Sequence, residues 1–230
     1  MKNKALFTGI ALAMGLSLSP ATHAAVLYSQ LSNDTGSGTA SQDFETVYDA
    51  YDSAGADDFV VTGSGWNISE IYFAGDAGLH GGAFDIAIYS NAAGLPGGAV
   101  VLLDDVSFSE DSEGNITATL GSPVTLVAGT YWLSGVADRD LESFGQWYWH
   151  SSSVQTGFAS AWQNPGDAFG TGCTTWATKT GCVVGQGPDF VFEIRGTVAD
   201  AGTVPEPMTL ALFGLGLAGL GAIRRKKRAV

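Results

Sequence analysis

The side chains in this sequence that could recognise a ligand are aromatic rings in two short stretches. Trp147 and Trp149 are two residues apart, so in a β-strand their indoles share one face while Tyr148 takes the other. Trp162 follows in a polar stretch. Flat rings of this kind stack on sugar faces, although large aromatics more often fill the core. The sequence leaves both uses open for the three tryptophans: a glycan-binding face or core packing.

Residues that could perform catalysis are poorly placed. His80 lies in a glycine-rich turn and His150 ends an aromatic stretch, without the spacing of metal ligands. Asp57 and Asp58 cannot form a glycosidase pair with each other, because adjacent residues of a strand point to opposite faces. The sequence contains no Gly-x-Ser-x-Gly elbow and no His-Glu-x-x-His motif. We therefore predict no catalytic residues, with a secreted carbohydrate-active enzyme as the alternative.

One acidic turn offers oxygen ligands for a cation. Residues 111–115 read Asp-Ser-Glu-Gly-Asn, and carboxylate and carbonyl oxygens are what Ca²⁺ prefers. The spacing of an EF-hand loop is absent, so a solvated turn is the simpler interpretation. We expect neither a metal site nor a cofactor, and Ca²⁺ is the cation that this turn would take.

Charge separates the middle of the chain from its two ends. Residues 25–203 hold three of the ten basic residues and 22 of the 23 acidic ones, which gives a net charge of −19. Such a surface repels nucleic acid and anionic polymers, so we expect no nucleic-acid partner. It also keeps an exported protein soluble. The stretch is long enough for one domain with its own hydrophobic core.

The N-terminus has the three parts of a secretory signal peptide. Lys2 and Lys4 precede an uncharged, mostly apolar run from Ala5 to Leu18, and small residues up to Ala24 follow. This order predicts a signal peptide over residues 1–24, which the Sec translocon and signal peptidase handle. A retained N-terminal anchor is the alternative.

The C-terminus repeats the pattern in reverse. It begins with the motif Val204, Pro205, Glu206 and Pro207, in which the two prolines favour an extended, accessible backbone. An uncharged run over residues 208–223 follows, about 24 Å long as a helix, which predicts one short transmembrane helix. Cations resist translocation, so the basic tail predicts a cytoplasmic end and a domain outside the cytoplasm. The tail consists of Arg224, Arg225, Lys226, Lys227 and Arg228.

Residues 204–230 resemble the PEP-CTERM sorting signal, in which a Pro-Glu-Pro motif, a short apolar helix and an Arg-rich tail occur together. The resemblance implies recognition by an exosortase, a membrane-embedded transpeptidase-like enzyme. It also implies a transient inner-membrane anchor, followed by removal of the tail and transfer of the body to the cell surface or to an extracellular polysaccharide matrix. A tail-anchored protein that is never cleaved is the alternative.

Export bears on the two cysteines. Cys173 and Cys182 are nine positions apart in the middle of the chain. In an oxidising compartment an isolated pair forms one disulfide, and a metal site would need further ligands nearby. We therefore predict a Cys173–Cys182 disulfide.

The middle of the chain has an all-β pattern. Alternating apolar and polar residues, β-branched and aromatic side chains, and glycine-rich turns recur over residues 57–151 and 189–198. In the stretch 83–89, Phe84, Ile86 and Ile88 share one face and Asp85 takes the other. About eight such strands predict a two-sheet, jelly-roll-like β-sandwich over residues 25–203, with long loops at 152–188. The proposed role is structural, adhesive or glycan-binding.

Overall fold

The computed structural model describes residues 24–77 and 80–199, and its strands form three sheets. The first sheet has the order β1-β16-β5-β10-β9. Its strands are β1 (Ala25–Ser29), β16 (Phe192–Val198), β5 (Trp66–Phe73), β10 (Ile116–Leu126) and β9 (Ser107–Glu110). Every neighbouring pair in it is antiparallel.

The second sheet has the order β14-β13-β4-β11-β7-β8, and β3 pairs with β11 outside this path. Its strands are β14 (Ala177–Thr178), β13 (Ala161–Gln163), β4 (Ala54–Val61), β11 (Gly129–Asp138), β7 (Ala83–Ala92), β8 (Leu95–Leu103) and β3 (Gln42–Asp43). The third sheet has the order β15-β12-β2, with β6 paired to β12. It consists of β15 (Asp189–Phe190), β12 (Trp147–Ser152), β2 (Asp34–Ala40) and β6 (Gly75–Ala77). Three short helices join them: η1 (Thr46–Tyr51), α1 (Leu141–Phe144) and α2 (Lys179–Cys182).

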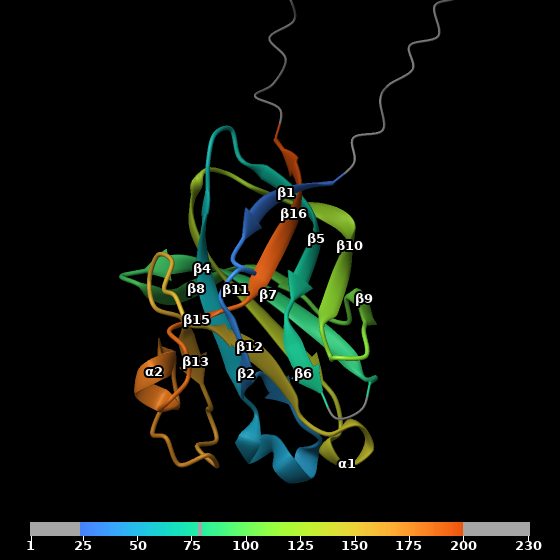
Figure 1. Ribbon diagram of the computed structural model, residues 1–230, viewed down its shortest axis with the longest axis vertical. Helices are drawn as coiled ribbons and strands as arrows, with labels where there is room; N and C mark the ends of the chain where they lie inside the picture. The colour runs from blue at the N-terminus through green and yellow to red at the C-terminus, as the bar shows by residue number, and fades with distance from the viewer. Residues whose placement is uncertain (1–23, 78–79, 200–230) are drawn as a thin grey trace, which may run out of the picture.

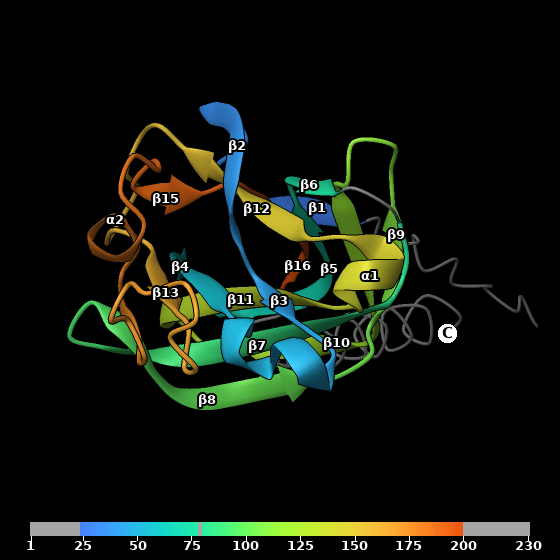
Figure 2. The ribbon, with the colours of Figure 1, turned by 90° about the horizontal axis from the view of Figure 1, so that it is seen from below.

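The all-β prediction is confirmed, and the prediction of two sheets is wrong. The third sheet arises because β2, β6 and β15 add to β12 through backbone hydrogen bonds, which leave no hydrophobic pattern in the sequence. In the end-on view, β12, β2 and β15 lie on the side of the core opposite β7 and β8 (Figure 2). The prediction of plain loops over residues 152–188 is also corrected, because β13, β14 and α2 form there.

The core confirms the predicted faces of β7. Phe84, Ile86 and Ile88 are buried, and their strand runs between β11 and β8. Phe84 meets Phe73 of the first sheet edge to face, with ring centroids 5.1 Å apart. Gly135 of β11 permits this contact, because a Cβ there would lie only 2.5 Å from the Phe73 ring. The rings of the two large sheets therefore interlock across a single core.

The two ends of the described chain lie at one end of the molecule. Ala25 of β1 pairs with Gly196 of β16, so the first strand begins beside the point where the last one ends. Figure 1 shows both ends at the top, whereas η1 and α1 lie at the bottom. The helices η1 and α1 are therefore at the end of the domain opposite the chain ends.

The predicted membrane segments lie outside the described residues. This applies to the signal peptide 1–24, of which only Ala24 is described, and to the helix 208–223. Within residues 24–77 and 80–199, no helix combines the length and apolar character needed to span a bilayer.

Candidate functional site

The three tryptophans for which the sequence leaves glycan binding and core packing open are buried. Trp147 and Trp149 share one face of β12, as predicted, but this face is the inner one. Trp149 stacks on Phe190 with ring centroids 4.3 Å apart and donates its indole N–H to the carbonyl of Val191. Trp162 is buried too, and its indole N–H bonds the carbonyl of Ala40 at 2.8 Å. Core packing is therefore what the structure has for Trp147 and Trp149, whereas Trp162, although almost fully buried, lines the second cavity described below.

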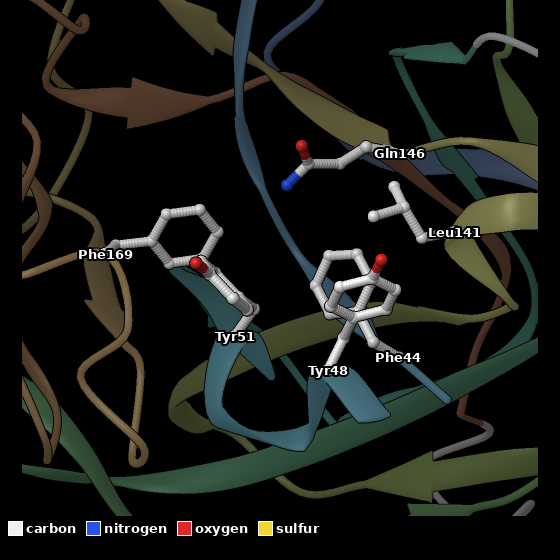
Figure 3. A pocket seen from close by; sticks show the side chains of 6 residues that line it. All are labelled: Phe44, Tyr48, Tyr51, Leu141, Gln146 and Phe169. Carbon is white, nitrogen blue, oxygen red and sulfur yellow. The ribbon is translucent and has the colours of Figure 1, made fainter. Parts of the chain in front are cut away.

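Exposed aromatic rings gather instead at the end of the domain that carries η1 and α1. A cavity of about 240 Å³ opens there. Figure 3 shows the side chains that surround it, which are Phe44, Tyr48, Tyr51, Leu141, Gln146 and Phe169. Tyr48 and Tyr51 come from η1, Leu141 from α1 and Phe169 from the loop after β13, whereas Phe44 precedes η1 and Gln146 precedes β12. We call this space the first cavity.

The helix η1 explains how two of these rings come together. It has 3₁₀ geometry, in which residues three apart lie on the same side, and Tyr48 and Tyr51 have this spacing. Their ring centroids are 6.3 Å apart, and Tyr51 meets Phe169 edge to face at 5.2 Å. Tyr51 and Phe169 are each 39% exposed, so both keep part of a ring face free. The three-residue spacing of Tyr48 and Tyr51 is the signal in the sequence that indicates this pair of rings.

A buried asparagine holds the loop that carries Phe169 against η1. The Asn164 side-chain amide donates to the carbonyls of Ala50 and Asp52, both at 2.8 Å, and its oxygen accepts the backbone N–H of Phe169 at 3.2 Å. Gly166 is needed for this approach, because a Cβ there would lie 2.5 Å from the Ala50 Cα. The first cavity is thus preorganised by hydrogen bonds between segments that are distant in sequence.

A second cavity of about 360 Å³ adjoins the first, since Gln146 and Phe169 line both. Its other lining residues are Gly38, Thr39, Ala40, Tyr148, Trp162, Thr171, Val183 and Gln186. Tyr148 projects from the face of β12 opposite Trp147 and Trp149. Its hydroxyl donates to the side-chain carbonyl oxygen of Gln146 at 2.6 Å. Burial, and to a lesser extent the charge of Asp76, raises the pKa of Tyr148. Tyr148 is therefore the ring of this strand that a ligand can reach.

The predicted disulfide borders the second cavity and is confirmed. Cys173 and Cys182 are bonded, with 5.9 Å between their Cα atoms. The cavity-lining residue Val183 directly follows Cys182, and Thr171 is two residues before Cys173. The bridge therefore ties together the two loop segments that form one wall of this cavity.

Carboxylates are next in sequence to residues that line the first cavity. Asp43 precedes the lining residue Phe44, and burial together with the charges of Asp52, Asp138, Asp85 and Asp49 raises the pKa of Asp43 to about 6. Burial also raises the pKa of Asp52, although the Phe44 backbone N–H that bonds its carboxylate acts in the opposite direction. No lysine or arginine among the described residues lines either cavity. The ionisable side chains next in sequence to Phe44 and Tyr51 are therefore acidic.

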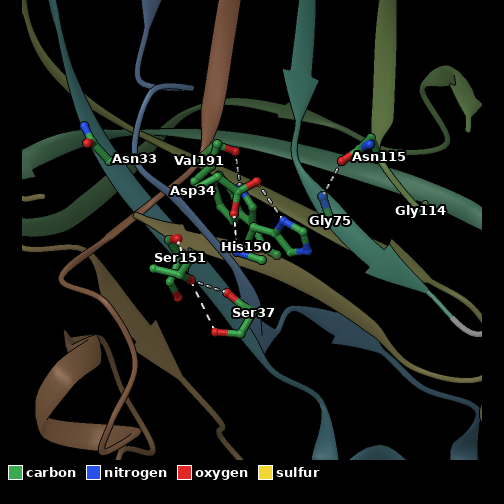
Figure 4. A network of polar contacts seen from close by, with 12 residues as sticks. Asn33, Asp34, Ser37, Gly75, Gly114, Asn115, His150, Ser151 and Val191 are labelled. Carbon is green, nitrogen blue, oxygen red and sulfur yellow. Dashed lines mark hydrogen bonds and ion pairs between the residues drawn. The ribbon is translucent and has the colours of Figure 1, made fainter. Parts of the chain in front are cut away.

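The polar pair that most resembles catalytic machinery lies elsewhere, on β2 and β12. The Nδ1 atom of His150 is 3.0 Å from a carboxylate oxygen of Asp34 (Figure 4). Such a carboxylate can orient an imidazole that acts as a base. The other ring nitrogen, Nε2, is buried and makes no hydrogen bond with any described residue, so no hydroxyl or thiol is in position to be activated. His80 lies 3.5 Å from Glu110 and away from this pair in sequence.

The strongest perturbation of charge is a buried cluster that the sequence did not suggest. Lys179 is buried, donates to Ser151 Oγ at 3.1 Å and to the Asp189 carbonyl at 2.7 Å, and lies 3.7 Å above the Phe190 ring. Burial lowers its pKa to about 7, against the opposing effect of Asp57 and Asp189. The cluster joins α2 to β12 and β15 and lines neither cavity. We interpret it as a structural tie.

The acidic turn that offers oxygen ligands for Ca²⁺ uses the Asp111 carboxylate for its own backbone. Asp111 accepts hydrogen bonds from the backbone N–H groups of Glu113 and Asn115 and from the Asn115 amide. Burial alone would raise the pKa of Asp111, but these bonds lower it. In the described part of the chain, no group of three or more His, Cys, Asp and Glu side chains is arranged to hold a metal ion. The geometry thus gives the calcium expectation no support.

Fold and site together define a β domain with an aromatic groove at one end, and the C-terminal sequence carries a separate signal. A family model described as the PEP-CTERM protein-sorting motif matches residues 203–226. The match confirms the resemblance and includes Val204, Pro205, Glu206, Pro207 and the first three cations of the tail; all lie outside the described residues. The motif implies an exported protein that an exosortase processes. Comparison with curated proteins found no match, and neither did comparison with solved structures.

Proposed function

We propose that this protein is a non-catalytic glycan-binding protein of the cell surface or extracellular matrix, with an adhesive or structural role in a polysaccharide matrix. The observation that carries the proposal is the pair of adjoining cavities, in which partly exposed aromatic rings meet amide and hydroxyl groups. Rings of this kind cover the apolar faces of sugars, and the polar groups bond to sugar hydroxyls. The sorting motif supports this proposal, because it implies export and matrix polysaccharide lies outside the cell.

A jelly-roll-like scaffold is part of the proposal. Support comes from the strand order β1-β16-β5-β10 in one sheet and β4-β11-β7-β8 in the other. These eight antiparallel strands, with the third sheet added at one side, follow the order of two Greek keys. Such a scaffold places its connecting segments at the two ends, which is where η1, α1 and the loop with Phe169 form the first cavity.

The test is retardation of the full-length chain in gels that contain matrix polysaccharide from a producing strain, with the protein kept in a detergent that has no sugar headgroup. Tyr51→Ala removes an exposed ring from the first cavity, and we expect at least about tenfold weaker binding. Phe158→Ala is the matched control, because Phe158 is 42% exposed and lines neither cavity. Its binding should equal that of the unchanged protein.

Two results would contradict the proposal. Equal losses in the Tyr51 and Phe158 variants would mean that the groove has no special part in binding. Release of new reducing ends from the polysaccharide, abolished by replacing one acidic residue, would favour the alternative of a secreted carbohydrate-active enzyme.

A further inference from the structure

The second cavity contains a polar atom that the fold leaves without a partner. Thr39 lines this cavity and is only 4% exposed, and its hydroxyl oxygen makes no hydrogen bond with any described residue. Burying an unpaired hydroxyl destabilises a folded protein, so such a group points to a partner that a ligand or a water supplies. Thr39 is therefore a polar residue in the wall of the second cavity, and its buried oxygen becomes a contact point when a ligand or a water displaces the side chains that cover it.

The junction between the cavities also contains polar groups that the fold leaves without a partner. Gln146 lines both cavities, and its carbonyl oxygen is occupied by the Tyr148 hydroxyl. This leaves the amide N–H groups of Gln146, for which no bond to a described residue is present. Figure 3 shows the Gln146 amide directed into the space between Phe169 and Leu141. One ligand that passes Gln146 can thus occupy the first cavity and reach Thr39 in the second.

The charges near the groove restrict what this ligand can be. Asp49 is exposed in η1 between Tyr48 and Tyr51, and Glu142 is exposed next to Leu141. The cations of the described chain are committed elsewhere: Lys179 and Arg139 are buried, and Arg195 pairs with carboxylates on the first sheet. A chain of uronic acids would meet only like charges here.

We propose that the two cavities form one extended site for a polysaccharide that carries free amino groups. This inference rests on the glycan-binding function proposed above and adds the class of glycan. The rings of Tyr51, Phe169 and Tyr148 take the apolar faces of successive sugars, Thr39 and Gln146 bond to hydroxyl groups, and the carboxylates at the mouth attract the ammonium groups.

The experiment compares three probes on the full-length chain: a β-linked glucosamine hexamer, its N-acetylated counterpart and a polygalacturonate of similar length. Binding is measured by calorimetry at a pH at which the amines carry their protons. We expect the glucosamine hexamer to bind about tenfold more tightly than the acetylated one, and polygalacturonate not to bind. The advantage should shrink as ionic strength rises from about 0.1 M to about 1 M, because the carboxylates are exposed.

Two variants separate the contribution of the Asp49 charge to binding from that of the Thr39 hydroxyl. Asp49→Asn should weaken binding of the glucosamine hexamer by about two- to fivefold and leave binding of the acetylated hexamer unchanged. Glu113→Gln, in the turn between β9 and β10, is the control: it also removes one negative charge and should leave binding of both hexamers unchanged. Thr39→Val keeps the shape of the side chain. It should weaken binding of both hexamers while the denaturation midpoint stays equal or rises, a combination that a purely structural hydroxyl would not give.

The outcomes are distinguishable. Equal or tighter binding of the acetylated hexamer, or binding of polygalacturonate, overturns the assignment of an amine-bearing ligand while glycan binding stands. Unchanged affinity in Thr39→Val overturns the extended site. If none of the probes and no matrix polysaccharide binds, the glycan-binding function itself fails.

Discussion

Lys179 is a cation held entirely inside the protein. Its ammonium group is bonded to Ser151 and to the Asp189 carbonyl, and it lies on the Phe190 ring. Asp57 is buried close by, and its carboxylate accepts hydrogen bonds from Gln30 and from the Phe190 backbone. Burial raises the pKa of Asp57 well above its ordinary value. The charges therefore depend on one another, and none of them reaches solvent.

We predict that Lys179→Met lowers the free energy of unfolding by about 3 kcal/mol at pH 7, because it leaves buried carboxylates without their cation. Burial raises the pKa of Asp189 to about 6. Near pH 5, Asp189 is therefore protonated in the folded protein and ionised in the unfolded chain, where its pKa is lower. Acid therefore neutralises the carboxylate that the variant leaves unpaired. The loss should be smaller at pH 5 than at pH 7 in urea unfolding.

Arg195→Met is the comparison for that measurement. Arg195 forms ion pairs with Glu70 and Glu193 but is partly exposed, so its removal should cost at most about 1 kcal/mol. If both variants lose the same stability at pH 7, the buried cluster has no special role.

Among single residues, the stretch Trp147-Tyr148-Trp149 shows what the alternation of side chains along a β-strand can predict. It assigned the two tryptophans to one face and Tyr148 to the other, which the structure confirms. It could not tell which face the remaining chain would cover, because that depends on Phe190 and Phe73 from distant strands packing against Trp149. The ring that a ligand can reach proved to be Tyr148.

Among the elements, the segment between β12 and β15 builds much of the groove. It contributes Phe169, Thr171, Val183 and Gln186 to the cavity walls, and the Cys173–Cys182 bridge closes a loop within it. Buried Trp162 anchors one part of this segment, and the bridge and the Asn164 hydrogen bonds restrain the rest.

We predict that the double substitution Cys173→Ser with Cys182→Ser lowers the free energy of unfolding by about 2 to 3 kcal/mol, because the unfolded chain gains freedom. It should also weaken glycan binding, since Val183 and Thr171 lose their fixed separation. Chemical denaturation and gel retardation measure the two effects. Full binding in a chain shown by mass to lack the bridge would contradict the second expectation.

The elements found from sequence share one property. Strands such as β5 and β7 bury alternate apolar side chains, and this alternation is visible in the sequence. The strand β2, with the sequence Asp-Thr-Gly-Ser-Gly-Thr-Ala, has no such pattern, and pairing with β12 is what makes it a strand. Local pattern thus predicted most of the two large sheets, whereas the third sheet and the groove depend on contacts between distant segments.

At the scale of the whole molecule, sorting is encoded apart from the domain. We predict that replacing Pro205 and Pro207 by alanine blocks processing, because the backbone of the motif loses its bias toward an extended form. Nearly all of the exported chain should then keep residues 208–230, which the mass of the cell-associated protein reveals. Pro123→Ala, in the exposed part of β10, should be processed normally. Normal tail removal in the double variant would mean that the enzyme reads another feature.

The position of the chain ends gives the molecule a direction. Val198 finishes β16 beside the start of β1, while the groove opens at the opposite pole, near η1 and α1. A molecule fastened by its C-terminus would therefore hold its aromatic mouth away from the attachment point, a full domain length into the surroundings. Many copies attached side by side would present parallel grooves to one long polymer. Many weak binding events would then give strong overall retention through avidity.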